Sequence, residues 1–209
     1  MAVDAEHISR RFGRRWALTD ISFQMPRGSV MMVAGPNGSG KSTLFRVLST
    51  VIRADQGRAS VAGFDVKTHR DDVRRAVAFL SHYSYLYESL TARENLQVAA
   101  DHAGLTRDRV MPLLDRVTLA ARADHAVSTF SAGMRKRLSF ARVLLQDASV
   151  VMLDEPYAQL DPDGFALVDD VVRDLKSRGT TVLIATHQID RAQKLADAAL
   201  FLDEGRVRR

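Results

Sequence analysis

The chain has 209 residues, of which 46% are apolar and 26% are charged, an ordinary composition for one or two compact globular units. It contains no cysteine, which excludes disulfides and thiolate metal sites and is compatible with a reducing cytoplasm. The net charge of +5 is compatible with attraction to anionic lipid, nucleotide or nucleic acid, or with a solvated basic surface.

No segment has the features of a signal peptide or a membrane-spanning helix. The first six residues lack an apolar core, and the longest apolar runs, such as Val30 to Ala34 and Val150 to Leu153, have the length of a strand. A spanning helix needs roughly 20 apolar residues. We therefore expect any role at a membrane to come through a partner.

The first third of the chain is predicted to contain a strand, a second strand, a glycine-rich loop and a helix, in that order. Ala17 to Met25 is predicted to form a strand, and Ser29 to Ala34 a short apolar strand that leads into the loop. Lys41 to Val51 has helical spacing of its apolar residues. Residues 84–146 are predicted to be mostly helical, and Thr91 and Glu94 fit a capping box that opens one helix.

Two further apolar strands are predicted, at Ser149 to Leu153 and at Thr180 to Ala185. Between them, Asp161 and Pro162 are suited to the N-cap and first position of a helix that would run to about Arg178, with Gly179 ending it. Strands alternating with helices at both ends of the chain, separated by a helical insert, predict an α/β core with a helical subdomain.

The glycine-rich loop matches the P-loop pattern G-x-x-x-x-G-K-[ST], and it lies between a predicted strand and a predicted helix. Glycines let backbone N–H groups surround phosphate oxygens, and the helix N-terminus adds its positive dipole end. Lys41 would reach the β- and γ-phosphates, and the Ser42 hydroxyl would ligate Mg²⁺. The sequence thus predicts ATP and Mg²⁺ as ligands, with nucleotide contacts from Gly35, Pro36, Asn37, Gly38, Ser39, Gly40, Lys41, Ser42 and Thr43.

The strand that ends in Asp154 and Glu155 supplies two carboxylates. Asp154 is suited to the Mg²⁺ site, and Glu155 to a general base for the attacking water or to a group that orients it. Carboxylates are common where strands leave a core, so only the presence of the P-loop indicates that this pair is functional.

The segment Phe130-Ser131-Ala132-Gly133-Met134 distinguishes between classes of P-loop protein. It lies 23 residues before Asp154, counted from Ser131, and resembles the ABC signature Leu-Ser-Gly-Gly-Gln. The residues after it, Arg135 to Gln146, are predicted to form a helix. An ordinary helix start with a Ser N-cap is the alternative interpretation.

With these motifs the chain is identified as a member of the ABC transporter ATPase family, and the resemblance covers essentially the whole chain. It implies one domain over residues 1–209, with a RecA-like parallel P-loop NTPase core at about 1–82 and 147–209. The core would carry an N-terminal antiparallel β region, and the helical subdomain would span about 83–146.

The resemblance implies a head-to-tail dimer, or paired ATPase subunits, with ATP between one P-loop and the other signature. Ser131 and the Gly133 N–H would then meet the γ-phosphate in trans. Ala132 replaces a glycine of the family pattern, and Met134 replaces a glutamine whose amide hydrogen bonds it cannot make. The resemblance also implies integral membrane subunits as partners and a cytoplasmic, peripheral location on the inner face of the cell membrane. It implies no nucleic-acid partner.

Four further positions receive roles from the resemblance. Asp161, in Ala158-Gln159-Leu160-Asp161, resembles the family's D-loop aspartate, and His187, 33 residues after Asp154, resembles its switch histidine. Phe12 matches the aromatic residue that stacks on adenine, with Trp16 as its competitor. His82 stands at the coupling position, where the family has glutamine; it could bind a water, contact a partner or be a neutral replacement.

Residues 82–96, with histidine at the coupling position, resemble the heme-exporter ATPases of cytochrome c maturation. The chain also ends soon after Asp203 to Arg206, which leaves no room for a regulatory tail, as in that subfamily. The alternative within the class is an ATPase of a drug, lipid or polysaccharide exporter. Other classes are a soluble ABC ATPase acting on nucleic acid or ribosomes, and a small-molecule kinase with a P-loop.

Overall fold

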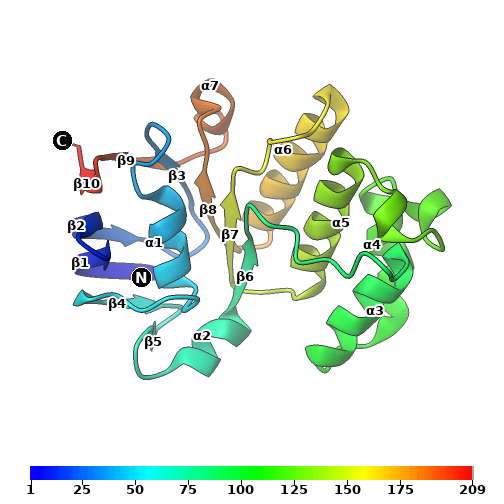
Figure 1. The fold of residues 1–209 in the computed structure, drawn as a ribbon, viewed down its shortest axis with the longest axis horizontal. Coiled ribbons are helices and arrows are strands. Elements are labelled where there is room, and N and C mark those ends of the chain that lie inside the picture. Colours follow the sequence, from blue (N-terminus) through cyan, green and yellow to red (C-terminus); the bar gives the residue numbers. More distant parts are fainter. Residues whose placement is uncertain (209) are drawn as a thin grey trace. The chain divides into compact units, whose positions relative to one another are not determined.

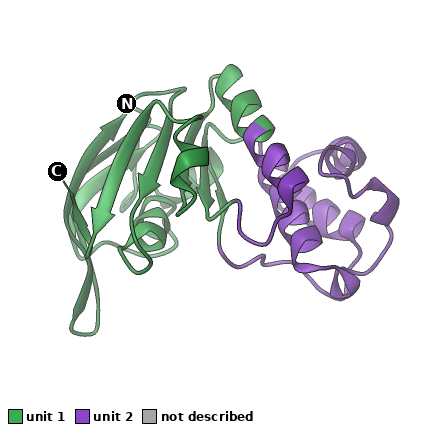
Figure 2. Cartoon of the chain, turned by 90° about the horizontal axis from the view of Figure 1, so that it is seen from above, with its two compact units in different colours: residues 1–81, 148–156, 170–209 green, residues 82–147, 157–169 purple. Residues whose placement is uncertain are grey.

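The computed structural model describes residues 1–208, and their contacts divide them into two compact units (Figure 2). The first unit contains residues 1–81, 148–156 and 170–208, and the second contains 82–147 and 157–169. Compared with the expected core and subdomain, the segment 157–169 joins the helical unit, although it follows the strand that ends in Asp154.

The N-terminal sheet of the first unit is antiparallel and has the strand order β2-β1-β4-β5. In β1 and β2 the register pairs Val3 with Met25, and Ile8, Leu18 and Ile21 turn into the core. The strand expected over Ala17 to Met25 is confirmed, with two more residues at its start. The four strands are β1 (Val3–Phe12), β2 (Arg15–Met25), β4 (Gln56–Val61) and β5 (Phe64–Asp65).

The central sheet has the strand order β10-β9-β3-β8-β7-β6, and every pairing except β10 with β9 is parallel (Figure 1). All five residues of β3, β7 and β8 are buried, as expected for strands covered on both faces. The expected α/β P-loop fold with an antiparallel N-terminal region is confirmed. The strands are β3 (Val30–Ala34), β6 (Val77–Leu80), β7 (Val150–Asp154), β8 (Thr181–Ala185), β9 (Ala198–Asp203) and β10 (Arg206–Val207).

The helix after the glycine-rich loop is shorter than the sequence predicts. It ends at Leu48 rather than Val51, because Thr50 takes a left-handed conformation with φ of 63°. Two arginines hold this end: Arg70 donates to the Thr50 carbonyl and Arg74 to its hydroxyl. This helix is α1 (Lys41–Leu48), and the other helices of this unit are α2 (Arg70–Ala76), α7 (Ile189–Ala192) and the part of α6 (Pro162–Ser177) that lies beyond residue 169.

The second unit is helical, as the sequence predicts for residues 84–146. The capping box at the start of α3 is confirmed in both halves: the Thr91 hydroxyl accepts from the Glu94 N–H, and the Glu94 carboxylate accepts from the Thr91 N–H. Leu96, Leu114 and Phe140 are fully buried in this unit. Its helices are α3 (Ala92–His102), α4 (Val110–Arg116), α5 (Ala132–Leu145), the part of α6 up to residue 169, and three 3₁₀ turns at Arg107–Arg109, Ala120–Arg122 and Val127–Thr129.

None of the helices within residues 1–208 has both the length and the apolar character needed to cross a membrane.

Candidate functional site: a phosphate-binding loop and an acidic strand end

Backbone crowding, and not only flexibility, requires glycine in the loop between β3 and α1. Gly35 has φ of 147° and Gly40 has φ of 106°, conformations that other residues rarely adopt. A Cβ atom at Gly35 would lie 2.0 Å from the Leu202 carbonyl oxygen, and one at Gly40 would lie 2.6 Å from the Ala17 carbonyl oxygen. The loop is thus held between the end of β9 and the start of β2.

Lys41 opens α1 and folds its side chain back over the loop. Its ammonium group donates to the carbonyl oxygens of Gly35 and Pro36 at 2.8 and 3.1 Å, and the residue is only 6% exposed. A buried cation whose partners are neutral carbonyl groups would be stabilised by a charge-assisted hydrogen bond to an incoming anion. The N-cap residue Gly40 supplies no side-chain cap, so the first-turn N–H groups of α1 are available to phosphate oxygens.

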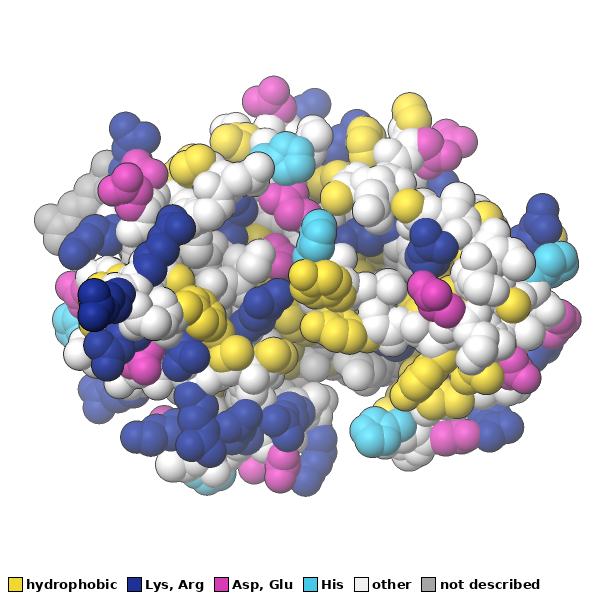
Figure 3. Space-filling model, in the orientation of Figure 1, with side chains coloured by type: hydrophobic (Ala, Val, Ile, Leu, Met, Phe, Trp, Pro, Cys, Tyr) yellow, Lys and Arg dark blue, Asp and Glu magenta, His cyan; other side chains and the backbone are white. Residues whose placement is uncertain are grey.

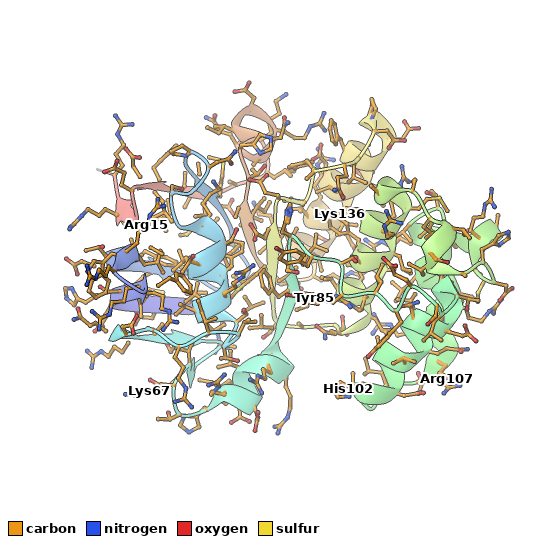
Figure 4. The ribbon with its side chains drawn as sticks, viewed as in Figure 1. Arg15, Lys67, Tyr85, His102, Arg107 and Lys136 are labelled. Carbon is orange, nitrogen blue, oxygen red and sulfur yellow. The ribbon has the colours of Figure 1, made fainter. Side chains whose placement is uncertain are left out.

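A hollow of about 480 Å³ lies beside the loop. Trp16 and Arg15 from β2 line it, and Arg15 is labelled in Figure 4. The hollow is lined by the aromatic competitor Trp16 and not by Phe12, whose ring stacks under the Arg10 guanidinium at 4.9 Å. The remaining lining residues are Pro36, Asn37, Gly38, Ser39, Asp203, Glu204 and Gly205.

The turn at Asp203 to Gly205, which belongs to this hollow, was not singled out from the sequence. Gly205 donates its N–H to the Ser39 carbonyl and accepts from the Thr19 N–H, so the turn braces the glycine-rich loop. A short hairpin signal was available: an apolar strand, then Asp-Glu-Gly, then Arg-Val.

Glu155 and His187 meet at the carboxyl ends of β7 and β8. The His187 Nδ1 atom lies 2.9 Å from Glu155 Oε2, and the two side chains are 59% and 17% exposed. With Glu155 ionised, its carboxylate can only accept, so Nδ1 would be the donor in this pair. The sequence prediction that both residues belong to one site matches this geometry, while their chemical roles stay proposals.

Asp154 is the last residue of β7 and is 1% exposed. Ser42, in the first turn of α1, is half-buried. Within residues 1–208 no group of three or more His, Cys, Asp or Glu side chains could hold a metal ion. A hydroxyl and one carboxylate fit Mg²⁺, which commonly takes few protein ligands and completes its shell with phosphate and water oxygens.

In the second unit the predicted signature residues form the start of α5. Ser131 is the N-cap, and its hydroxyl accepts from the Met134 N–H at 3.2 Å. The alternative interpretation, a helix start with a Ser cap, therefore describes the local structure, but it leaves the hydroxyl proton and the Gly133 N–H for another acceptor. Arg135 donates to the Phe130 carbonyl and fixes the entry to the helix.

Asp161 caps the start of α6 and also pairs with α5. Its carboxylate accepts from the Gly164 N–H at 2.8 Å and from Arg137 Nη2 at 2.9 Å. The Gly164 hydrogen bond first, and then the Arg137 hydrogen bond, hold the pKa of Asp161 below its usual value. Arg137 was not singled out from the sequence, because nothing in the pattern of α5 distinguishes it from its basic neighbours.

His82 is exposed and makes an edge contact with the Tyr83 ring, with centroids 5.6 Å apart. Tyr83, Tyr85 and Tyr87 are all more than half exposed. Arg142 holds the backbone of this segment by donating to the Tyr85 carbonyl at 2.7 Å. These contacts assign His82 no metal or nucleotide role.

Lys and Arg side chains gather over the region of β5 and α2, at the lower left of Figure 3. Arg53, Arg70 and Arg74 line a shallow hollow there, together with Asp71 and Asp72. Arg74 pairs with Asp71, and Arg70 bonds to the Thr50 carbonyl. Much of this positive charge is therefore paired or capping a helix, as in a solvated basic surface.

Comparison with known proteins places the chain among transporter ATP-binding proteins. A family model described as ABC transporter matches residues 18–158. Daunorubicin resistance ATP-binding protein DrrA3 of Streptomyces coeruleorubidus is 41% identical, over 99% of this chain and 66% of that protein. Nod factor export ATP-binding protein I of Bradyrhizobium diazoefficiens is 35% identical, over 98% of this chain and 68% of that protein. A solved ATP-binding subunit of an ABC transporter has a TM-score of 0.93 and 27% identity, covering 100% of this chain and 89% of that one.

The chain spans 64% to 68% of the length of the curated relatives that it matches. The family match nevertheless includes the glycine-rich loop, the signature segment and the acidic strand end. The geometry of the loop around Lys41 and the meeting of Glu155 with His187 agree with that match. The chain belongs to the ABC transporter family of ATP-binding proteins.

Proposed function

We propose that the chain is the ATP-hydrolysing subunit of an exporter whose membrane-spanning part is a separate partner. The observation that carries the proposal is the Glu155–His187 hydrogen bond, in the same compact unit as the glycine-rich loop. The loop would hold the phosphates of ATP, with Lys41 turning from its carbonyl partners to the β- and γ-phosphates. Mg²⁺, held by Ser42 and Asp154, would neutralise phosphate charge.

Glu155 is suited to accept a proton from the attacking water, since a positioned carboxylate can act as a general base. His187 holds that carboxylate through Nδ1, and its side chain is 59% exposed. Donation from Nε2 to the γ-phosphate would need the doubly protonated imidazole, since the phosphate oxygens only accept. Ser131 and the Gly133 N–H would complete the site from a second copy, in a head-to-tail dimer. The first-turn N–H groups of α5 give this segment the character of an anion site.

The test of hydrolysis compares the full wild-type chain with two variants. Glu155→Gln should bind Mg-ATP but lose turnover by on the order of 10²- to 10⁴-fold, because it keeps the shape of the site without its base. Lys41→Ala should weaken ATP binding itself, because it removes the buried cation. ATP turnover by Glu155→Gln at the wild-type rate would refute the assignment of Glu155.

The transported substrate is proposed to be a drug or another exported small molecule, and not heme. The relatives named above carry the names of drug resistance and Nod factor export, and none of them supports the role in cytochrome c maturation expected from residues 82–96. The ATPase would sit on the inner face of the membrane beneath its partner, with His82 and the exposed tyrosines as candidates for contact with it.

The host organism separates these substrates. Lys41→Ala at the native locus should raise sensitivity to an exported compound and leave covalently hemylated c-type cytochromes intact on heme-stained gels. Loss of those cytochromes, with b-type hemes preserved, would instead restore the heme assignment.

A further inference from the structure

The two segments assigned to a neighbouring nucleotide belong to one compact unit. The signature segment, residues 130–134, and the D-loop, residues 158–161, both lie in the second unit. Between them the chain leaves this unit for β7, which carries Asp154, and then returns. Sequence proximity does not hold the two segments together, so their relative position depends on the contacts between them.

The first contact is made by one arginine, which forms an ion pair with Asp161 and a hydrogen bond with Thr118. Arg137 of α5 donates through Nη2 to Asp161 Oδ1 at 2.9 Å. Its Nη1 donates to the Thr118 hydroxyl at 2.5 Å. Figure 4 labels the preceding residue, Lys136. The Arg137 side chain is only 13% exposed. A guanidinium held by two partners and largely shielded from water is fixed in direction.

The second contact is a close approach of the two backbones at Gly133 and Gln159. A Cβ atom at Gly133 would lie 3.1 Å from the Gln159 carbonyl oxygen, closer than ordinary van der Waals contact. Gln159 has φ of 66°, a left-handed conformation that turns the D-loop at this point. One contact lies at the start of α5 and the other a turn further along, so together they fix both the position and the direction of the D-loop.

We propose that Arg137 is a positioning residue that holds the signature and the D-loop as one surface, so that both engage a second copy of this chain together. The proposal rests on the proposed ATPase function and its dimer. Arg137 would act through its partners Asp161 and Thr118, and it is assigned no contact with the nucleotide. Exposed ion pairs contribute little to stability, but a displacement of about 1 Å in a catalytic group can reduce a rate by on the order of 10²-fold.

The first test measures the contact without using activity. In Arg137→Ala, hydrogen exchange at the amides of Gly164 and Phe165 should accelerate, because Asp161 loses the partner that holds its carboxylate. Asp161→Asn is the milder variant: asparagine still caps the helix but lacks the charge. Unchanged exchange in both variants would overturn the proposal.

The second test separates positioning from folding. Arg137→Ala should lower kcat for ATP by on the order of 10-fold or more, with the Kd for Mg-ATP within about twofold of wild type, since the glycine-rich loop lies in the other unit. Arg137→Lys should restore part of kcat because it keeps a donor and the charge. In the Glu155→Gln background, Arg137→Ala should also reduce the ATP-dependent dimer fraction.

The matched control is Arg93→Ala, which removes a bidentate pair with Asp124 in the same unit, and neither residue belongs to the two segments. It should leave kcat and dimerisation unchanged. Wild-type kcat in Arg137→Ala, or an equal loss in Arg93→Ala, would overturn the positioning role. Absence of ATP turnover in the wild-type chain would instead refute the proposed function, while the exchange measurement would still decide whether the contact exists.

Discussion

Glu155 and His187 come together because two parallel strands end side by side. Asp154 at the end of β7 pairs with Ala185 at the end of β8, so the residues that follow emerge at the same edge. Glu155 then takes a left-handed conformation with φ of 48°, and its N–H donates to the Ala185 carbonyl at 2.8 Å. A non-glycine residue in this conformation is strained, and such strain is often found at functional sites.

Removal of the His187 side chain should therefore lower turnover more than affinity. We expect His187→Ala to reduce kcat by on the order of 10²-fold, because Glu155 loses the partner that holds it. The Kd for Mg-ATP should rise by a smaller factor than kcat falls, since Lys41 and the glycine-rich loop, the main proposed ligands of the phosphates, are unchanged. His69→Ala removes an exposed histidine elsewhere in the same unit and should turn over ATP at the wild-type rate. Equal losses in the two variants would contradict the assignment.

We expect Trp16, and not Phe12, to stack on the adenine ring. Trp16 lines the hollow beside the loop and is the single tryptophan of the chain. Mg-ATP should change its fluorescence, and Trp16→Ala should weaken binding by roughly 1–3 kcal/mol, the usual cost of a lost aromatic–base stack. Phe12→Ala should bind almost as well as wild type. The reverse result would return the role to Phe12, as the family resemblance implies.

Single residues were predictable from the sequence where a motif fixes their place in the chain. The structure places Lys41 over the glycine-rich loop and Glu155 beside His187, as their motifs predict, while their roles in the site stay predictions. The choice between Phe12 and Trp16 depends on how a hairpin twists, and Arg137 pairs with a residue 24 positions away. Neither the adenine-stacking residue nor the Arg137 pairing can be predicted from local sequence, because both depend on contacts between distant segments.

At the scale of elements, the glycine-rich loop is held by strands on both sides. The end of β9 crowds Gly35, while β2 crowds Gly40, and the β9–β10 turn bonds to the loop through Gly205. The N-terminus of α1 is thereby fixed before any phosphate arrives. Preorganised donors bind an anion without an ordering cost at the moment of binding.

A methyl group at Gly40 should disturb this arrangement. In Gly40→Ala the new Cβ would meet the Ala17 carbonyl oxygen at 2.6 Å, a backbone atom that cannot move aside alone. We expect a loss of about 1–3 kcal/mol in the free energy of unfolding, measured in urea, and weaker ATP binding. Gly104→Ala is the control: its φ of 67° is also left-handed, but nothing lies within 4 Å of a Cβ there. It should cost about 1 kcal/mol and leave ATP affinity intact.

Elements were predictable where a periodic pattern and a boundary signal agree. The capping box at Thr91 and the buried strands β7 and β8 were located within a residue or two. The end of α1 was misplaced because its apolar period continues past Leu48, whereas Thr50 turns left-handed and is held by arginines from α2. Contacts between elements overrode the local pattern there.

At the scale of the molecule, residues expected to bind a copy's own ATP and residues expected to contact the partner's ATP lie in different compact units. The loop, Asp154, Glu155 and His187 lie in the first unit, while the signature and the D-loop lie in the second. Each copy would thus use one unit for its own ATP and the other for its partner's. Composition and charge gave no indication of this division, since the segment 157–169 follows a core strand and still joins the helical unit.

This division predicts that the cap of α5 and the in-trans contact can be separated by mutation. Ser131→Asp keeps an N-cap acceptor for the Met134 N–H but turns a carboxylate toward the partner's γ-phosphate. Folding and Mg-ATP binding by the monomer should therefore be preserved, with little change in the free energy of unfolding. The ATP-dependent dimer should be lost, because like charges meet at the interface.

Sedimentation in the Glu155→Gln background, with and without Mg-ATP, would measure the dimer fraction. Ser131→Thr is the matched control, since it keeps both the hydroxyl and the cap and should dimerise as the parent does. The bulkier Ser131→Arg should also block closure, but it removes the cap as well. If Ser131→Asp dimerises with ATP as readily as Ser131→Thr, the hydroxyl serves only to cap the helix, and the signature does not reach a neighbouring nucleotide through Ser131.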